Sequence, residues 1–228
     1  MTILKDLFQV FYPKICANCE QQLLQNETII CTFCRHDLPL TNFNCYSDNK
    51  IIKSFYGKVN IEYGNALLYY KKQGITKKLI QELKYKGNQQ IGVLMGNWLG
   101  EIIKNNPSFA KVDFIIPVPL HPKKEKIRGY NQVSEFGKTI SKHLNKPFLE
   151  SILQRTSTSK TQTIKSRFER FNNNDTKFTT KNTNLIRNKH LLLVDDVITT
   201  GATLEACSKA LQKTTGVKIS ILTMAYTA

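Results

Sequence analysis

The sequence predicts an α/β protein, in which helices flank a parallel β-sheet and a small four-cysteine module precedes it. Apolar runs without polar alternation, such as 112–118 and 191–194, are typical of strands buried on both faces of a parallel sheet. Stretches with apolar residues at helical spacing lie between these runs. Two Cys-x-x-Cys pairs come before them all. We therefore expect two units, residues 1–48 and residues 49–228.

The four cysteines of the first unit have the spacing of a metal site. Cys16 and Cys19 form one Cys-x-x-Cys pair, and Cys31 and Cys34 form a second after 11 residues. Four thiolates suit tetrahedral Zn²⁺, and such a site has no open position, so we expect a structural zinc. A redox role for one pair is the alternative.

Two further residues of this unit could act as substitute ligands. These are His36 and Cys45. The simpler interpretation is that His36 is solvated and that Cys45 is a small buried residue.

The rest of the chain predicts strands and helices in alternation. The polar stretch 41–54 is a plausible linker. Strands are expected at 61–70, 112–118, 147–149, 177–180, 191–194 and 219–226. Helices are expected around 75–83, 91–103 and 133–144 and after Gly201, and Trp98 is expected in the core.

The segment that follows residues 191–194 predicts a phosphate site. Asp195 and Asp196 end the apolar run, and the small-residue turn 199–203 precedes a helix. A helix N-terminus offers unpaired N–H groups and about half a positive charge. Gly201 allows close approach of an anion, and threonine hydroxyls add donors. Carboxylates accept hydrogen bonds from sugar hydroxyls and help to hold Mg²⁺. Together these groups describe a site for a ribose 5-phosphate, whereas the alternative is a strand followed by a capped helix.

A basic segment follows the strand 112–118. Lys124 and Arg128 lie in this loop, and Gly129 allows a ligand to come close. Because ligands of open α/β sheets bind at the carboxyl ends of strands, this loop and the acidic pair should share one crevice. We expect the loop to bind a pyrophosphate group, unless it is merely a solvated turn. His121 is expected to be structural.

The polar stretch 154–175 is too long for an ordinary connection, so it is either disordered or a closing lid. Its basic residues, Arg155 among them, would suit closure over an anionic substrate.

Charge and hydropathy limit the possible environments. The net charge of +16 is consistent with nucleic-acid binding. A coding bias toward AT-rich codons would produce the same excess of lysine, so both explanations stay open. No run approaches the ~20 apolar residues of a membrane span. Residues 3–11 indicate a short amphipathic helix and no signal peptide, so we expect a cytoplasmic protein.

The motifs resemble a known family. The segment 191–203 resembles the binding motif of type I phosphoribosyltransferases at every position. The four-cysteine module, KLIQELKYKGNQ, IIPVPLHPKKEKIRGYNQ and SKTQTIKSRFER extend the resemblance to the ComF family (ComF/GntX) of competence proteins. Tyr130 replaces a phenylalanine of that family, and a third Cys-x-x-Cys is reduced to Cys45. The resemblance implies a type I phosphoribosyltransferase-like fold and a role in DNA uptake during natural transformation.

The first functional hypothesis is an enzyme that binds 5-phosphoribosyl 1-pyrophosphate (PRPP) with Mg²⁺. A nitrogen nucleophile would attack C1 of the ribose and displace pyrophosphate. The acceptor is not readable from the sequence. The residues expected to bind PRPP are Lys124, Asp195, Asp196, Thr199, Thr200, Gly201, Ala202 and Thr203. Those expected to act in catalysis are Asp195, Asp196 and Arg128.

The second hypothesis is a non-catalytic protein that keeps the nucleotide pocket. Its lysine-rich surface and zinc module would bind single-stranded DNA or other competence proteins. Pyrophosphate release in the presence of candidate bases would discriminate between the two hypotheses.

Overall fold

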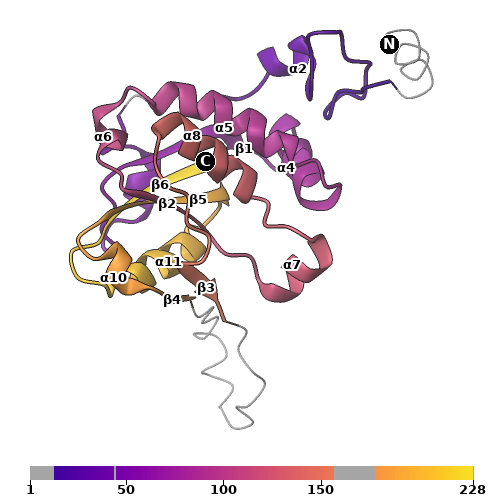
Figure 1. The fold of residues 1–228 in the computed structure, drawn as a ribbon. Coiled ribbons are helices and arrows are strands. Elements are labelled where there is room, and N and C mark those ends of the chain that lie inside the picture. The colour runs from indigo at the N-terminus through magenta and orange to yellow at the C-terminus, as the bar shows by residue number, and fades with distance from the viewer. Residues whose placement is uncertain (1–12, 44, 157–177, 228) are drawn as a thin grey trace, which may run out of the picture.

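A four-stranded parallel sheet forms the centre of the protein (Figure 1). The computed structural model describes residues 13–43, 45–156 and 178–227. The strands of this sheet are β1 (Gly64–Tyr70), β2 (Phe114–Pro117), β5 (His190–Ile198) and β6 (Lys218–Thr227). They lie in the order β1-β6-β5-β2, and every neighbouring pair is parallel.

Helices cover both faces of the sheet, and the strands bury side chains in each direction. Leu192 and Val194 of β5 belong to the apolar cluster under α4 (Ile75–Tyr85), α5 (Gln90–Ile103) and α8 (Ser134–Leu144). Leu191 and Leu193 belong to the opposite cluster, with α3 (Lys50–Ser54) and α11 (Ala202–Gln212). Alternate residues of a strand point to opposite faces, so one apolar run serves two cores.

The helices α5 and α8 pack closely because glycines lie along their contact. Gly92, Gly96 and Gly100 recur every four residues on one face of α5. A Cβ at Gly96 would lie 2.7 Å from the Cβ of Thr139 on α8. These glycines therefore fix how near α8 comes to α5, and α8 begins directly after the residues that approach the acidic pair.

The remaining elements are short. They are α2 (Thr32–His36), α6 (Pro107–Ala110), α7 (Pro122–Arg128), α10 (Thr183–Ile186) and an antiparallel pair, β3 (Leu153–Arg155) with β4 (Phe178–Thr180). Among the helices of the described residues, none is long and apolar enough to cross a membrane.

Several local predictions are corrected by the structure. The stretch 41–54 is not simply a linker, because Asn49 caps α3 and Ile51 of that helix is fully buried. The basic segment after β2 forms the helix α7, which Pro122 begins and the left-handed Gly129 ends. The predicted strand 147–149 is a single bridge from Phe148 to Ile115. The predicted helix 3–11 and most of the stretch 154–175 lie outside the described residues.

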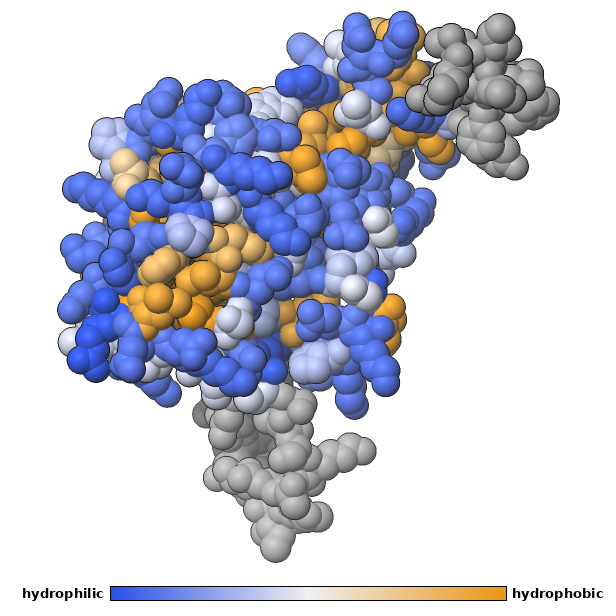
Figure 2. Space-filling view, in the orientation of Figure 1, coloured by the Kyte–Doolittle hydropathy of each residue, from blue (hydrophilic) through white to orange (hydrophobic). Residues whose placement is uncertain are grey.

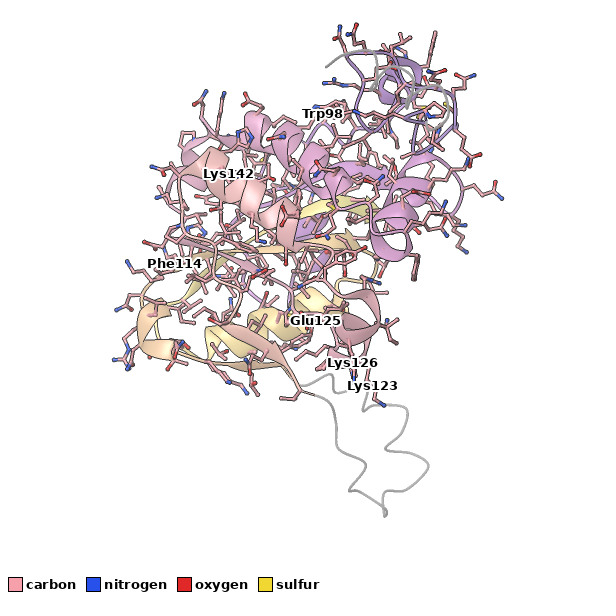
Figure 3. The ribbon with its side chains drawn as sticks, turned by 45° about the vertical axis from the view of Figure 1, so that its right-hand side comes forward. Trp98, Phe114, Lys123, Glu125, Lys126 and Lys142 are labelled. Carbon is pink, nitrogen blue, oxygen red and sulfur yellow. The ribbon has the colours of Figure 1, made fainter. Side chains whose placement is uncertain are left out.

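The N-terminal module lies against α4 and α5 (Figure 1). Lys78 Nζ of α4 donates to the carbonyl oxygen of Asn18 at 2.9 Å. The guanidinium of Arg35 lies 5.1 Å from the ring centroid of Trp98, a half-buried residue of α5 (Figure 3). Trp98 is therefore only partly in the core, since it also forms a cation–π contact with the module.

Candidate functional site

The acidic pair is part of strand β5 and does not follow it. The predicted run ended at Val194, but β5 continues to Ile198. Both carboxylates are buried, with Asp195 8% and Asp196 6% exposed. The neighbouring strand β2 ends beside them, because the Val118 N–H donates to the carbonyl oxygen of Val194 at 2.9 Å. The carboxyl ends of β2 and β5 thus meet at the acidic pair, as expected from the sequence.

Asp196 is held by two side chains from other elements. Lys84 Nζ, near the end of α4, lies 2.8 Å from Asp196 Oδ2. Gln132 Nε2 donates to the same oxygen at 2.7 Å. Arg128 in turn donates to Gln132 Oε1, and its guanidinium lies 5.7 Å from the ring centroid of Tyr85. A polar chain therefore joins α4, α7 and β5 at one point.

The sequence analysis did not identify two members of this chain, Lys84 and Gln132. Both lie in the segments KLIQELKYKGNQ and IIPVPLHPKKEKIRGYNQ, which carried the family resemblance. That resemblance was the only available signal, because neither this lysine nor this glutamine belongs to a distinctive pattern by itself.

Burial makes Asp195 a weak acid. Desolvation, and secondly the charge of Asp196, raise the pKa of Asp195 from 3.8 to about 8, against the opposing effects of the Asp196 N–H, Lys84 and Arg155. Its Oδ1 accepts a hydrogen bond from the backbone N–H of Asp196 at 2.8 Å. A cation or a ligand that donates hydrogen bonds to Asp195 would favour the ionised form of this carboxyl group.

This pKa predicts a pH-dependent stability. Between about pH 4 and pH 8 the native protein binds a proton at Asp195 that the unfolded chain has lost, so the free energy of unfolding falls as pH rises. Asp195→Asn should therefore raise the Tm at pH 8 and change it less at pH 5. Each kcal/mol gained should raise the Tm by about 2–4 °C for a chain of this size.

Thermal unfolding at the two pH values measures this effect. Glu125→Gln, which removes an exposed carboxylate, is the control. The control should show the pH dependence of the wild-type Tm. If Asp195→Asn also shows that same dependence, the raised pKa of Asp195 is contradicted.

The turn after β5 presents open backbone at the start of α11. Thr199, Thr200, Ala202 and Thr203 are exposed. No side chain caps α11, and the Ala202 N–H has only a long contact of 3.4 Å to Thr200 Oγ1. The first amides of an α-helix have no partner within the helix, so this N-terminus is open to an anion.

Gly201 is required by its position. Its φ of +76° lies in the left-handed region, and a Cβ there would come within 3.2 Å of the Phe55 ring. An alanine would be strained and would push against α3. The turn therefore keeps its shape only with glycine, as the predicted phosphate site requires.

The basic segment, which forms α7, lies apart from the acidic pair except at its C-terminal residue, Arg128. Lys124 is on the exposed face of α7, where Lys123, Glu125 and Lys126 are also seen (Figure 3). Among the interactions of the described residues, none joins Lys124 to the acidic pair, whereas Arg128 reaches Asp196 through Gln132. His121 Nδ1 accepts from the Lys123 N–H at 3.2 Å and caps α7, which confirms its structural role.

A cleft of about 540 Å³ adjoins the acidic pair between α7, the start of α8 and β3. Its lining includes Asn131, Ser134, Glu150 and Arg155, but neither aspartate of the acidic pair. Arg155 connects the cleft to the acidic pair, because its positive charge lowers the pKa of Asp195. Its buried Nε has no hydrogen-bond partner among the residues that the structure describes.

The four predicted zinc ligands form one cluster. The sulfurs of Cys16, Cys19, Cys31 and Cys34 all lie within 4.8 Å of one another. Asn18 Nδ2 donates to the sulfur of Cys34 at 3.1 Å. The cluster fits a structural metal ion such as zinc, since it offers four thiolates with supporting donors and three of the four side chains are buried.

His36 and Cys45 are not part of this cluster. His36 is exposed beside Asp37, as predicted, but Cys45 is exposed and not buried, so that prediction is wrong. Cys45 lies in the turn before α3, where its sulfur is 3.7 Å from the hydroxyl oxygen of Ser47.

One known family matches the C-terminal part of the chain, which contains the acidic pair and the turn after it. Residues 134–227 match the family described as the phosphoribosyl transferase domain. This part of the chain is therefore similar to a phosphoribosyltransferase domain. The matched residues include α8, β5, the acidic pair and α11, and the predicted fold class, a phosphoribosyltransferase-like parallel sheet flanked by helices, is confirmed.

A curated relative has the name suggested by the sequence. A protein named Competence protein F, from Haemophilus influenzae, is 33% identical over 139 residues, which are 59% of this chain and 61% of that protein. The phosphoribosyltransferase-domain protein described here is therefore its distant homologue and matches less than two thirds of its length.

Solved structures with similarity to the chain include two phosphoribosyltransferase-type enzymes. Glutamine phosphoribosylpyrophosphate amidotransferase from B. subtilis is 16% identical with a TM-score of 0.40, over 62% of this chain and 30% of that one. Adenine phosphoribosyltransferase from Leishmania tarentolae is 10% identical with a TM-score of 0.38, over 78% and 88%.

Proposed function

We propose that the protein binds PRPP with Mg²⁺ where β2 and β5 end, and that it is a phosphoribosyltransferase. One observation supports this most: two buried carboxylates lie in the same strand that leads into the uncapped N-terminus of α11. The carboxylates would accept hydrogen bonds from the ribose hydroxyls, and the amides and hydroxyls of 199–203 would hold the 5-phosphate.

The reaction would depend mainly on position and charge. Asp195 and Asp196 would face the sugar, where their negative charge stabilises positive charge that develops on the ring as pyrophosphate leaves. Arg128 would stabilise the negative charge of the departing diphosphate. Its guanidinium is already linked to Asp196 by hydrogen bonds through Gln132. Mg²⁺ would supply charge neutralisation of the diphosphate, held by the same two carboxylates.

The cleft beside Arg155 is the place proposed for the acceptor. Its volume of about 540 Å³ lies within the usual range of small-molecule pockets. The side chains that line this cleft include glutamate carboxylates and side-chain amides. Their oxygens would accept hydrogen bonds from the N–H groups of a nitrogen nucleophile.

The four-cysteine module would hold zinc in a structural role. With four protein ligands the ion has no free position for substrate. We propose residues 1–48 as the zinc module and residues 49–228 as the phosphoribosyltransferase domain. The relative's name, Competence protein F, supports the further proposal of a role in DNA uptake during natural transformation.

Pyrophosphate release tests the enzymatic proposal. The protein is mixed with PRPP, Mg²⁺ and single candidate nitrogen bases, with and without single-stranded DNA, and free pyrophosphate is measured. Release that depends on one acceptor is expected. Binding of PRPP without release under any of these conditions would favour a non-catalytic role.

A second function is favoured by the surface of the module. Phe33 is 80% exposed and Leu24 is 73% exposed on a chain with net charge +16. Figure 2 shows apolar atoms among hydrophilic ones in this region. Exposed aromatic rings beside cations can stack on the bases of single-stranded DNA.

Oligonucleotide binding measured at several salt concentrations tests this second function. Affinity should fall steeply with salt and should weaken in Phe33→Ala, because both phosphate contacts and stacking contribute. Affinity that is absent, or insensitive to salt, would exclude it.

A further inference from the structure

Lys84 is the cation that directly contacts the acidic pair. Its Nζ lies 2.8 Å from Asp196 Oδ2, where its side chain is 24% exposed and that of Asp196 is 9% exposed. It comes from α4, in the part of the chain before the matched phosphoribosyltransferase segment at 134–227. The Lys84 side chain is thus largely, but not completely, withdrawn from solvent.

The environment of Lys84 differs from that of an ordinary surface lysine. Lys86, two residues later, forms an exposed pair with Glu82 on its own helix, at 2.7 Å. Lys84 instead crosses from its helix to the central strand of the site. An ammonium has three donors, and among the described interactions Lys84 Nζ uses one of them, with Asp196.

The proposed donor needs a cation at this point. The acidic pair and the turn 199–203 account for the ribose and the 5-phosphate, but the diphosphate on C1 adds further negative charge. Lys124 has no described contact with the acidic pair, and Arg128 reaches Asp196 only through Gln132, whereas Lys84 contacts Asp196 directly. Lys84 is therefore the cation best placed to meet the diphosphate near Asp196.

We propose that Lys84 is a PRPP-binding residue: it neutralises Asp196 and donates its remaining N–H groups to the diphosphate oxygens of the donor. This inference rests on the proposed function. It assigns to α4 a part in the site that neither the acidic motif nor the basic helix α7 provides.

The test compares two ligands that differ in the diphosphate. Calorimetry at fixed Mg²⁺ measures binding of PRPP and of ribose 5-phosphate to the full-length wild type, Lys84→Met, Lys84→Arg and Lys86→Met. Losing a charge-assisted hydrogen bond should weaken PRPP binding by about 10- to 100-fold in Lys84→Met. Ribose 5-phosphate binding should change by less than about threefold, because that ligand lacks the diphosphate. Lys84→Arg should recover part of the PRPP affinity, and Lys86→Met should match the wild type.

The outcomes separate this inference from the function on which it rests. If Lys84→Met binds PRPP as the wild type does, or weakens both ligands equally, Lys84 does not bind the diphosphate and the inference is overturned. If the wild type binds neither ligand, the proposed function fails and the inference fails with it.

Discussion

Replacing both members of the acidic pair, Asp195→Asn with Asp196→Asn, is expected to abolish PRPP binding while the protein stays folded. An amide keeps the shape of the carboxylate but loses the charge that would hold Mg²⁺ and accept the ribose hydroxyls. Asp195 is buried with a raised pKa, so its replacement removes a group whose ionisation opposes folding. Calorimetry should show affinity lowered at least about 100-fold, which is about 2.7 kcal/mol.

Exposed carboxylates provide the control for this double variant. Asp48→Asn with Glu101→Gln replaces the same number of carboxyl groups by amides, at residues paired with Lys53 and Lys104 at the surface. This control should bind PRPP as the wild type does. Unchanged affinity in the Asp195 and Asp196 variant, with a normal Tm, would refute the assigned site.

Removal of the proposed zinc ion is expected to unfold the proposed N-terminal module and to leave the rest of the chain folded. The described part of the module has little regular structure, with the five-residue α2 and one bridge from Ile15 to Gln22. Zinc binding to four thiolates can contribute about 10–16 kcal/mol, which replaces the core that so small a unit lacks. When a chelator is present, the module should therefore unfold first, and the rest of the chain should unfold later in a separate transition.

The protein contains one tryptophan, and it reports on the module. Trp98 contacts Arg35, so its fluorescence should change when the chelator acts, while the circular dichroism of the sheet and its helices is mostly kept. Cys31→Ser should have the same effect without chelator. Cys45→Ser should not, because Cys45 lies outside the cluster. Loss of all cooperative unfolding on chelation would contradict a separate module.

The sequence predicted the sheet well because its strands are buried on both faces. The runs that contain Leu191–Val194 and Ile219–Tyr226 have no polar alternation, and they form β5 and β6 at the centre. The four cysteines were predicted as one cluster because two Cys-x-x-Cys pairs at this spacing are typical of a zinc site.

Other features depend on contacts that a linear pattern does not show. Lys84 and Gln132 meet Asp196 only after α4, α7 and β5 come together, so neither had a signal of its own. The helix α7 was read as a loop because its charged face lacks an apolar stripe, and none of its residues is buried. Cys45 was expected inside because of residue type alone, and its turn places it in solvent.

A structure of the protein bound to PRPP and Mg²⁺ tests the central claim most directly. The 5-phosphate is expected on the amides of residues 199–203, with the ribose hydroxyls against Asp195 and Asp196. A complex in which the ligand lies elsewhere, and the start of α11 contacts only solvent, would contradict the account.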